Sequence, residues 1–143
     1  MIMKRFFSPS PLWQQQGLCI LRIIVGLFLV YHGIELFYPE KMKGYLTWDQ
    51  FKNSSGAFMV YLGKAVELVG GLLLLFGLFT RLAALLIAGT MLYVSFFVGG
   101  GKVWYEDQHP FLFVLLALVF FFTGPTKYSL DNFFKMDKTA LLK

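Results

Sequence analysis

The sequence predicts an all-α integral membrane protein, an antiparallel four-helix bundle with both termini in the cytoplasm. Hydrophobic residues make up 57% of the 143 residues and charged residues only 15%, a balance that a soluble domain of this size cannot bury. The apolar residues gather in long runs that lack the period-two alternation of membrane β-strands. Most basic residues lie at the ends of those runs, where membrane proteins keep them.

Four apolar runs are the expected spans, within a single transmembrane domain of residues 1–143. A helix needs about 20 apolar residues to cross the hydrocarbon core. The first two runs meet this length, the third is slightly shorter, and the fourth needs interfacial side chains or a locally thinner bilayer to complete its crossing. The predicted spans are residues 17–38, 57–79, 82–98 and 110–124.

The segments between the runs indicate how the spans connect. Only residues 77–81 separate the second span from the third, which predicts a tight antiparallel hairpin. Residues 40–55 form an outer loop whose aromatic side chains suit a short interfacial helix. Residues 132–143 combine phenylalanine with lysine, as expected of an amphipathic stub on an anionic leaflet. Lys and Arg are more numerous on the side of the termini, which predicts that both termini are cytoplasmic.

Ionisable side chains inside the spans are the candidate functional residues, because a charge at the centre of a membrane helix costs about 2.5–3.5 kcal/mol and needs a partner in the protein interior. Glu67 is the sharpest case. Gly70 and Gly71 follow it at three- and four-residue spacing, so its face is expected to pack closely against another helix. Its partner would be Lys64, Arg22 or a neutral hydrogen-bonding group. Both an interhelical anchor and a ligand or proton site fit this pattern.

The first span carries two further candidates. Arg22 shares a face with Gly26 and Gly33, and it either reaches the cytoplasmic surface or binds an acidic partner or anionic ligand within the bundle. His32 and Glu35 are three residues apart near the outer end of the span. They form either an interfacial polar cap or a proton-handling pair, since histidine titrates near neutral pH.

Glu106, Asp107 and His109 cluster at the outer mouth before the fourth span. They are either solvated loop charges or a rim shared with His32 and Glu35, because both ends fall on the same side. A metal site would require His109 to act with Glu35 or Glu106, and we predict no metal. No motif specifies a reaction, so no catalytic residue is assigned.

Several short motifs follow one another in a fixed order along the chain. They are Arg22 with Gly26 and His32-Gly33, Glu67 with Gly70-Gly71, the turn segment GLFTRLAA at 77–84 and the closing segment GPTKYSLD at 124–131. In their order and spacing, over about residues 17–133, they resemble the DoxX family of small bacterial membrane proteins. Leu36 stands about where the family often has a lysine.

The resemblance implies a four-helix bundle in the bacterial cytoplasmic (inner) membrane and a loose link to oxidoreductases. Our first hypothesis is a membrane subunit of a quinone-linked redox system. In it Arg22, His32, Glu67 and Arg81 orient a quinone headgroup or pass protons, and an oxidoreductase partner or the quinone supplies the redox centre. No covalently bound cofactor is expected. Lipid is an expected partner and nucleic acid is not.

Two alternatives belong to other functional classes. The first is a non-catalytic membrane anchor or assembly partner, in which Arg22 and Glu67 hold the bundle together. The second is a small transporter, which would need a homo-oligomer because four helices are too few for a typical inverted-repeat carrier.

Overall fold

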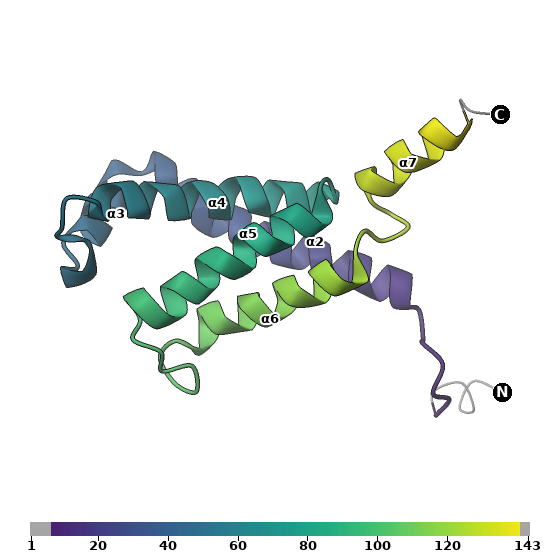
Figure 1. Ribbon diagram of the computed structural model, residues 1–143, viewed down its shortest axis with the longest axis horizontal. Helices are drawn as coiled ribbons and strands as arrows, with labels where there is room; N and C mark the ends of the chain where they lie inside the picture. The colour runs from purple at the N-terminus through teal and green to yellow at the C-terminus, as the bar shows by residue number, and fades with distance from the viewer. Residues whose placement is uncertain (1–6, 141–143) are drawn as a thin grey trace.

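The computed structural model describes residues 7–140, with side chains for residues 7–135, and this part of the chain is entirely helices and their connections (Figure 1). The predicted all-α class is therefore confirmed. The elements in chain order are α2 (Gln14–Gly33), η1 (Ile34–Phe37), α3 (Pro39–Leu46), η2 (Asp49–Phe51), α4 (Gly56–Phe76), α5 (Thr80–Tyr93), η3 (Val94–Val98), α6 (Gln108–Thr123) and α7 (Leu130–Ala140).

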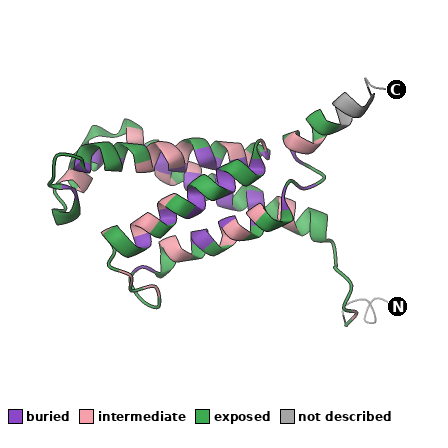
Figure 2. Ribbon diagram, viewed as in Figure 1, coloured by how far each residue is buried: buried purple, intermediate pink, exposed green. Residues whose placement is uncertain are grey.

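Three stretches are long and apolar enough to cross a membrane, namely Gln14–Phe37, Gly56–Phe76 and Thr80–Val98. Only 33%, 28% and 33% of their most apolar windows are buried inside the protein, so most of each helix presents apolar side chains outward, as lipid requires (Figure 2). The fourth predicted span is the 16-residue apolar helix α6. At 1.5 Å per residue it covers about 24 Å, less than a hydrocarbon core of about 30 Å.

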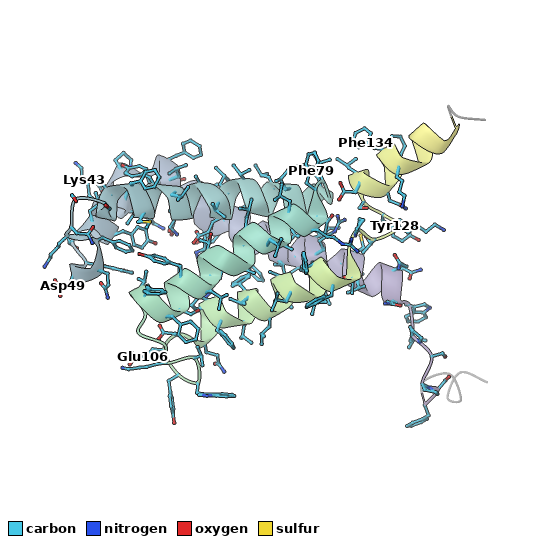
Figure 3. All side chains as sticks on the ribbon, viewed as in Figure 1. Lys43, Asp49, Phe79, Glu106, Tyr128 and Phe134 are labelled. Carbon is cyan, nitrogen blue, oxygen red and sulfur yellow. The ribbon has the colours of Figure 1, made fainter. Side chains whose placement is uncertain are left out.

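The helices run antiparallel, with α2 packed mainly on α4, and α5 on α6 (Figure 1). The start of α2, the turn at 77–79, the segment 124–130 and α7 meet at one end, called here the terminal end. The segment 34–55 and the connection 99–107 form the opposite, loop end. Figure 3 shows Tyr128 and Phe134 at the terminal end, and Lys43, Asp49 and Glu106 at the loop end. The buried apolar core lies between the ends and includes Leu29, Leu74, Ile87, Ala117 and Phe120.

Glycines allow α2 and α4 to approach backbone to backbone. A Cβ added to Gly33 would lie 2.4 Å from the Leu68 nitrogen, and one added to Gly26 would lie 2.8 Å from the Leu75 nitrogen. Gly71 faces Leu29 and the backbone of Val30 in the same way. The small, closely packed face predicted for these helices is therefore present, and it fixes the register of α2 on α4.

The predicted hairpin between the second and third spans is confirmed, and it is tighter than expected. Helix α4 ends at Phe76 and α5 begins at Thr80, with Gly77 (φ 67°) and Phe79 (φ 47°) in the left-handed region. Phe79 precedes α5 and has no capping oxygen in its side chain. The distant Asp131 supplies the cap, accepting hydrogen bonds from the backbone nitrogens of Phe79 (2.7 Å) and Thr80 (2.8 Å) and from the Thr80 hydroxyl (2.8 Å).

Asp131→Ala is therefore expected to lower the free energy of unfolding by about 1–2 kcal/mol, the usual range for losing a helix cap. Thermal unfolding of the purified protein in detergent, followed by circular dichroism, measures the change. Asp49→Ala is the matched control, because the Asp49 side chain is 89% exposed at the loop end. Equal stability of Asp131→Ala and the wild type would show that the cap contributes nothing.

Other boundaries differ modestly from those predicted. The first span continues beyond α2 as the 3₁₀ turn η1, and the third ends in the π-helical turn η3, where the Ser95 hydroxyl donates to the Met91 carbonyl (2.8 Å). The loop between the first and second predicted spans contains the short helix α3, which begins at Pro39. Helix α7 starts at Leu130, two residues before the predicted stub, and residues 141–143 of that stub lie outside the described chain.

Candidate functional site

Lys64 of α4 is the centre of a buried group of charges near the loop end. Its ammonium nitrogen lies 2.9 Å from a carboxylate oxygen of Glu35 and 2.9 Å from one of Glu67. It also donates to the backbone carbonyl of His32 at 3.4 Å. A lysine ammonium carries three N–H donors, so each donor has an acceptor. The Lys64 side chain is only 12% exposed, and these acceptors stabilise its charge inside the protein.

Glu35 of η1 joins this group to the short helix α3 at the loop end. One carboxylate oxygen accepts from Lys41 (3.0 Å), and the other accepts from the Tyr45 hydroxyl (2.6 Å) as well as from Lys64. Burial, followed by the hydrogen bond to Glu35, raises the pKa of Tyr45, so the phenol stays protonated as a donor. The hydrogen bond to Glu35 likewise raises the pKa of Lys41. Glu35, Lys41, Tyr45, Lys64 and Glu67 are called here the charge cluster.

Glu67 connects the charge cluster to two cavities. Its Oε2 atom accepts from Lys64, while its Oε1 atom accepts no hydrogen bond within the described residues. The first cavity, of about 200 Å³, is lined by Lys64, Glu67 and aromatic side chains and is called here the aromatic cavity. The second, of about 140 Å³, is called here the histidine cavity. The aromatic rings of the first belong to Tyr45, Trp48, Phe51 and Tyr93.

The histidine cavity brings His32 of α2 and His109 of α6 together. Their ring centroids are 6.0 Å apart in an edge-to-face arrangement, and Glu67 lines the same cavity. Three predicted candidates from different helices therefore converge. Glu106 does not join them, because it pairs with Lys102 (3.1 Å) in the loop and is 73% exposed. Asp107 is buried and accepts from the Lys102 backbone nitrogen (2.7 Å), which gives it a structural role in that loop.

Arg22 and Arg81 lie at the terminal end, away from Glu67 and the histidines. Arg22 is 1% exposed and donates to the Tyr128 carbonyl at 3.0 Å. Arg81 lies beside Gly124, where an added Cβ would be 3.1 Å from its guanidinium. The structure thus separates the predicted candidates into two groups, one at each end of the bundle. Arg22 is not the partner of Glu67, and the predicted alternative, Lys64, is.

The sequence identified Glu35 and Glu67 but gave no role to Lys41 and Tyr45 and treated Lys64 only as a partner of Glu67. The missing information was the register of α2 on α4. Once Gly33 is placed on Leu68, Glu35 and Lys64 fall on the same level of the helix pair. Within residues 7–135, no group of three or more His, Cys, Asp or Glu side chains is arranged to hold a metal ion.

A bundle of apolar helices with lipid-facing surfaces and buried ion pairs defines a small polytopic membrane protein. Residues 17–100 match the model of the DoxX family, and the chain belongs to that family, as its motifs indicated. Like the other members of this family, it is an integral membrane protein.

The relatives agree with this membership. The chain is 34% identical over 128 residues to an uncharacterized protein of Haemophilus influenzae, covering 82% of this chain and 91% of the relative. It is 33% identical over 127 residues (82% and 86%) to a Bacillus subtilis protein named "Putative oxidoreductase CatD". It is 30% identical over 126 residues (81% and 90%) to the inner membrane protein YqjF of Escherichia coli. No solved structure matches the chain significantly.

Proposed function

We propose that this protein is the membrane subunit of a quinone-linked oxidoreductase system, crossing the membrane four times with both termini in the cytoplasm. The observation that carries the proposal is the aromatic cavity, in which four aromatic rings meet the buried Lys64–Glu67 pair. The Bacillus subtilis relative named as an oxidoreductase supports the same class. An oxidoreductase partner supplies the electrons in this proposal.

The aromatic cavity fits a quinone headgroup in size and in chemistry. Its volume is about 200 Å³, and an apolar cavity of about 150 Å³ already accepts benzene. Tyr45, Trp48, Phe51 and Tyr93 offer ring faces for stacking. Lys64 and Tyr45 bring polar groups to its wall. Their N–H and O–H groups are donated to Glu35, Glu67 and the His32 carbonyl, so a quinone carbonyl would accept from them by displacing one of these acceptors.

Glu67 supplies a proton path from the histidine cavity to the aromatic cavity. A bound quinone takes up two electrons and two protons. Glu67 lines both cavities, and its Oε1 atom has no hydrogen bond within the described residues, so it can take a proton from the histidine side and present it on the aromatic side. His32 and His109 line the histidine cavity beside Glu67, so their ring nitrogens are the donors on that side of the path. Lys64 holds the Glu67 carboxylate in place between the two cavities.

The test begins with binding of a short-chain ubiquinone or menaquinone analogue to the purified protein in detergent. Trp48 lines the aromatic cavity, so bound quinone is expected to quench its fluorescence saturably, and Trp48→Phe is expected to remove that signal. Quinone is also expected in lipid extracts of the purified protein. If quinone does not quench the fluorescence and no quinone co-purifies with the protein, the proposal is overturned.

The second part of the test concerns Glu67. In membranes from a deletion strain complemented with variants, Glu67→Gln is expected to lower quinone reduction about 100-fold or more, the usual contribution of a proton-transferring side chain. Glu106→Gln is the matched control, because Glu106 is an exposed carboxylate at the same end. If Glu67→Gln lowers only the stability of the protein and leaves quinone reduction unchanged, the bundle acts as an anchor.

A further inference from the structure

Arg22 is a buried cation at the terminal end with no acidic partner in the described chain. It is 1% exposed, and its Nε and Nη1 atoms are buried without a hydrogen-bond acceptor. Only Nη2 is engaged, by the Tyr128 carbonyl at 3.0 Å and by the Cys19 sulfur at 3.8 Å. A buried guanidinium without a counter-charge is strongly unfavourable, so this site is incomplete without an anion.

The nearby carboxylates are committed elsewhere. Asp131 caps α5 through the backbone of Phe79 and Thr80, and Glu67 is paired with Lys64 near the other end of the bundle. The guanidinium is also held in position. It rests against Gly77, where an added Cβ would lie 1.4 Å from Nη1. The Arg22 side chain therefore cannot easily swing to another partner.

Arg22 lines a cavity of about 390 Å³ between α2, α4 and the segment that leads into α7. The exposed Lys127 also lines it, as does the buried Ser129, whose hydroxyl donates to the Thr126 carbonyl (2.6 Å). The remaining walls are apolar and include Ile23, Leu75 and Phe133. A buried arginine and an exposed lysine line the same cavity, and this pair favours a phosphate, since the guanidinium fork matches phosphate oxygens. The apolar walls, which continue into the membrane-facing surface of α2 and α4, favour an occupant with acyl chains.

We propose that this cavity binds the phosphate of an anionic phospholipid in the leaflet that the terminal end faces. Arg22 is the buried anchor and Lys127 the exposed one, while the acyl chains run along Ile23, Leu75 and Phe133. Helix α7 lies at the same end, where Figure 3 shows Phe134. Phe133 and Phe134 are both exposed and are placed to enter the same leaflet. The lipid thus closes the groove between the helix pair and α7. This site is separate from the aromatic cavity and does not depend on the quinone proposal.

The test compares phosphatidylglycerol with phosphatidylcholine of the same acyl chains, added to the full chain in a zwitterionic detergent. Native mass spectrometry measures retained lipid. The wild type is expected to retain phosphatidylglycerol about tenfold more strongly, because the choline cation of phosphatidylcholine cancels the phosphate charge and is repelled by Arg22 and Lys127. Lys127→Gln should reduce this preference and Arg22→Gln should remove it. Arg81→Gln, an exposed arginine at the same end, is the matched control and should keep it.

Three outcomes would overturn the proposal. The first is equal retention of the two lipids by the wild type. The second is competition by millimolar inorganic phosphate that fully displaces the lipid, which would identify a free-anion site. The third is an equal loss of preference in Lys127→Gln and Arg81→Gln, which would indicate diffuse surface charge. If Arg22→Gln does not fold, the wild-type ratio and the Lys127→Gln and Arg81→Gln variants decide the question.

Discussion

Replacing Lys64 with methionine is expected to lower the free energy of unfolding by roughly 3–5 kcal/mol, the usual effect of removing one member of a buried ion pair. The reason is that Lys64 serves two carboxylates at once, Glu35 and Glu67, each at 2.9 Å. Methionine keeps the length and apolar stem of the side chain. The loss therefore reports the charge and its hydrogen bonds and not the packing.

Unfolding in mixed detergent micelles, followed by circular dichroism, measures the effect of Lys64→Met. Lys52→Met is the matched control, because Lys52 pairs with Asp49 on the surface and its side chain is 63% exposed. Surface pairs contribute between about 0 and 1 kcal/mol, so this control should be close to the wild type. If both variants lose less than about 1 kcal/mol of unfolding free energy, the charge cluster does not stabilise the fold.

A second comparison separates Lys64 from its partners. If the loss in Lys64→Met comes from stranded carboxylates, then adding Glu67→Gln to it should recover part of the stability. The coupling between the two changes is expected to be about 0.5–3 kcal/mol, as for residues in one hydrogen-bonded network. Additive losses would show that Lys64 and Glu67 act independently, despite the 2.9 Å between their charged atoms.

The features that depend on local sequence could be predicted, and those that depend on how two helices pack against each other could not. Apolar runs and the glycine at 77 report local preferences, so the spans and the hairpin followed from them. Glu67 and its glycine neighbours indicated a helix-facing carboxylate, and the structure places Glu67 inside the bundle at 8% exposure. The link from Lys64 to Glu35 joins residues 29 positions apart and depends on how two helices lie against each other.

The two arginines illustrate the same limit. The sequence placed Arg22 and Arg81 with His32 and Glu67 in one quinone site, because all are ionisable and within or next to spans. In an antiparallel pair, however, the start of α2 lies beside the end of α4. Arg22 therefore meets Gly77, while Gly33 meets Leu68. The composition of a span does not determine this register. The close contacts of Gly26, Gly33 and Gly71 between α2 and α4 do determine it.

Gly33→Ala is expected to destabilise the protein by about 1–3 kcal/mol, although alanine is the better helix former. The added Cβ would lie 2.4 Å from the Leu68 nitrogen and 2.5 Å from its Cα atom. Both atoms are backbone, so α2 and α4 must move apart at this level. His32, whose carbonyl accepts from Lys64 at 3.4 Å, is the adjacent residue, and the movement therefore also loosens the charge cluster.

Gly89→Ala is the matched control for Gly33→Ala, and it should have the opposite sign. Gly89 is also helical, but an added Cβ meets nothing within 4 Å, so the change should stabilise the helix by about 0.5–1 kcal/mol. Thermal unfolding in detergent compares the two variants directly. Equal shifts of both variants in the same direction would contradict a close α2–α4 contact, because helix propensity alone predicts stabilisation at both positions.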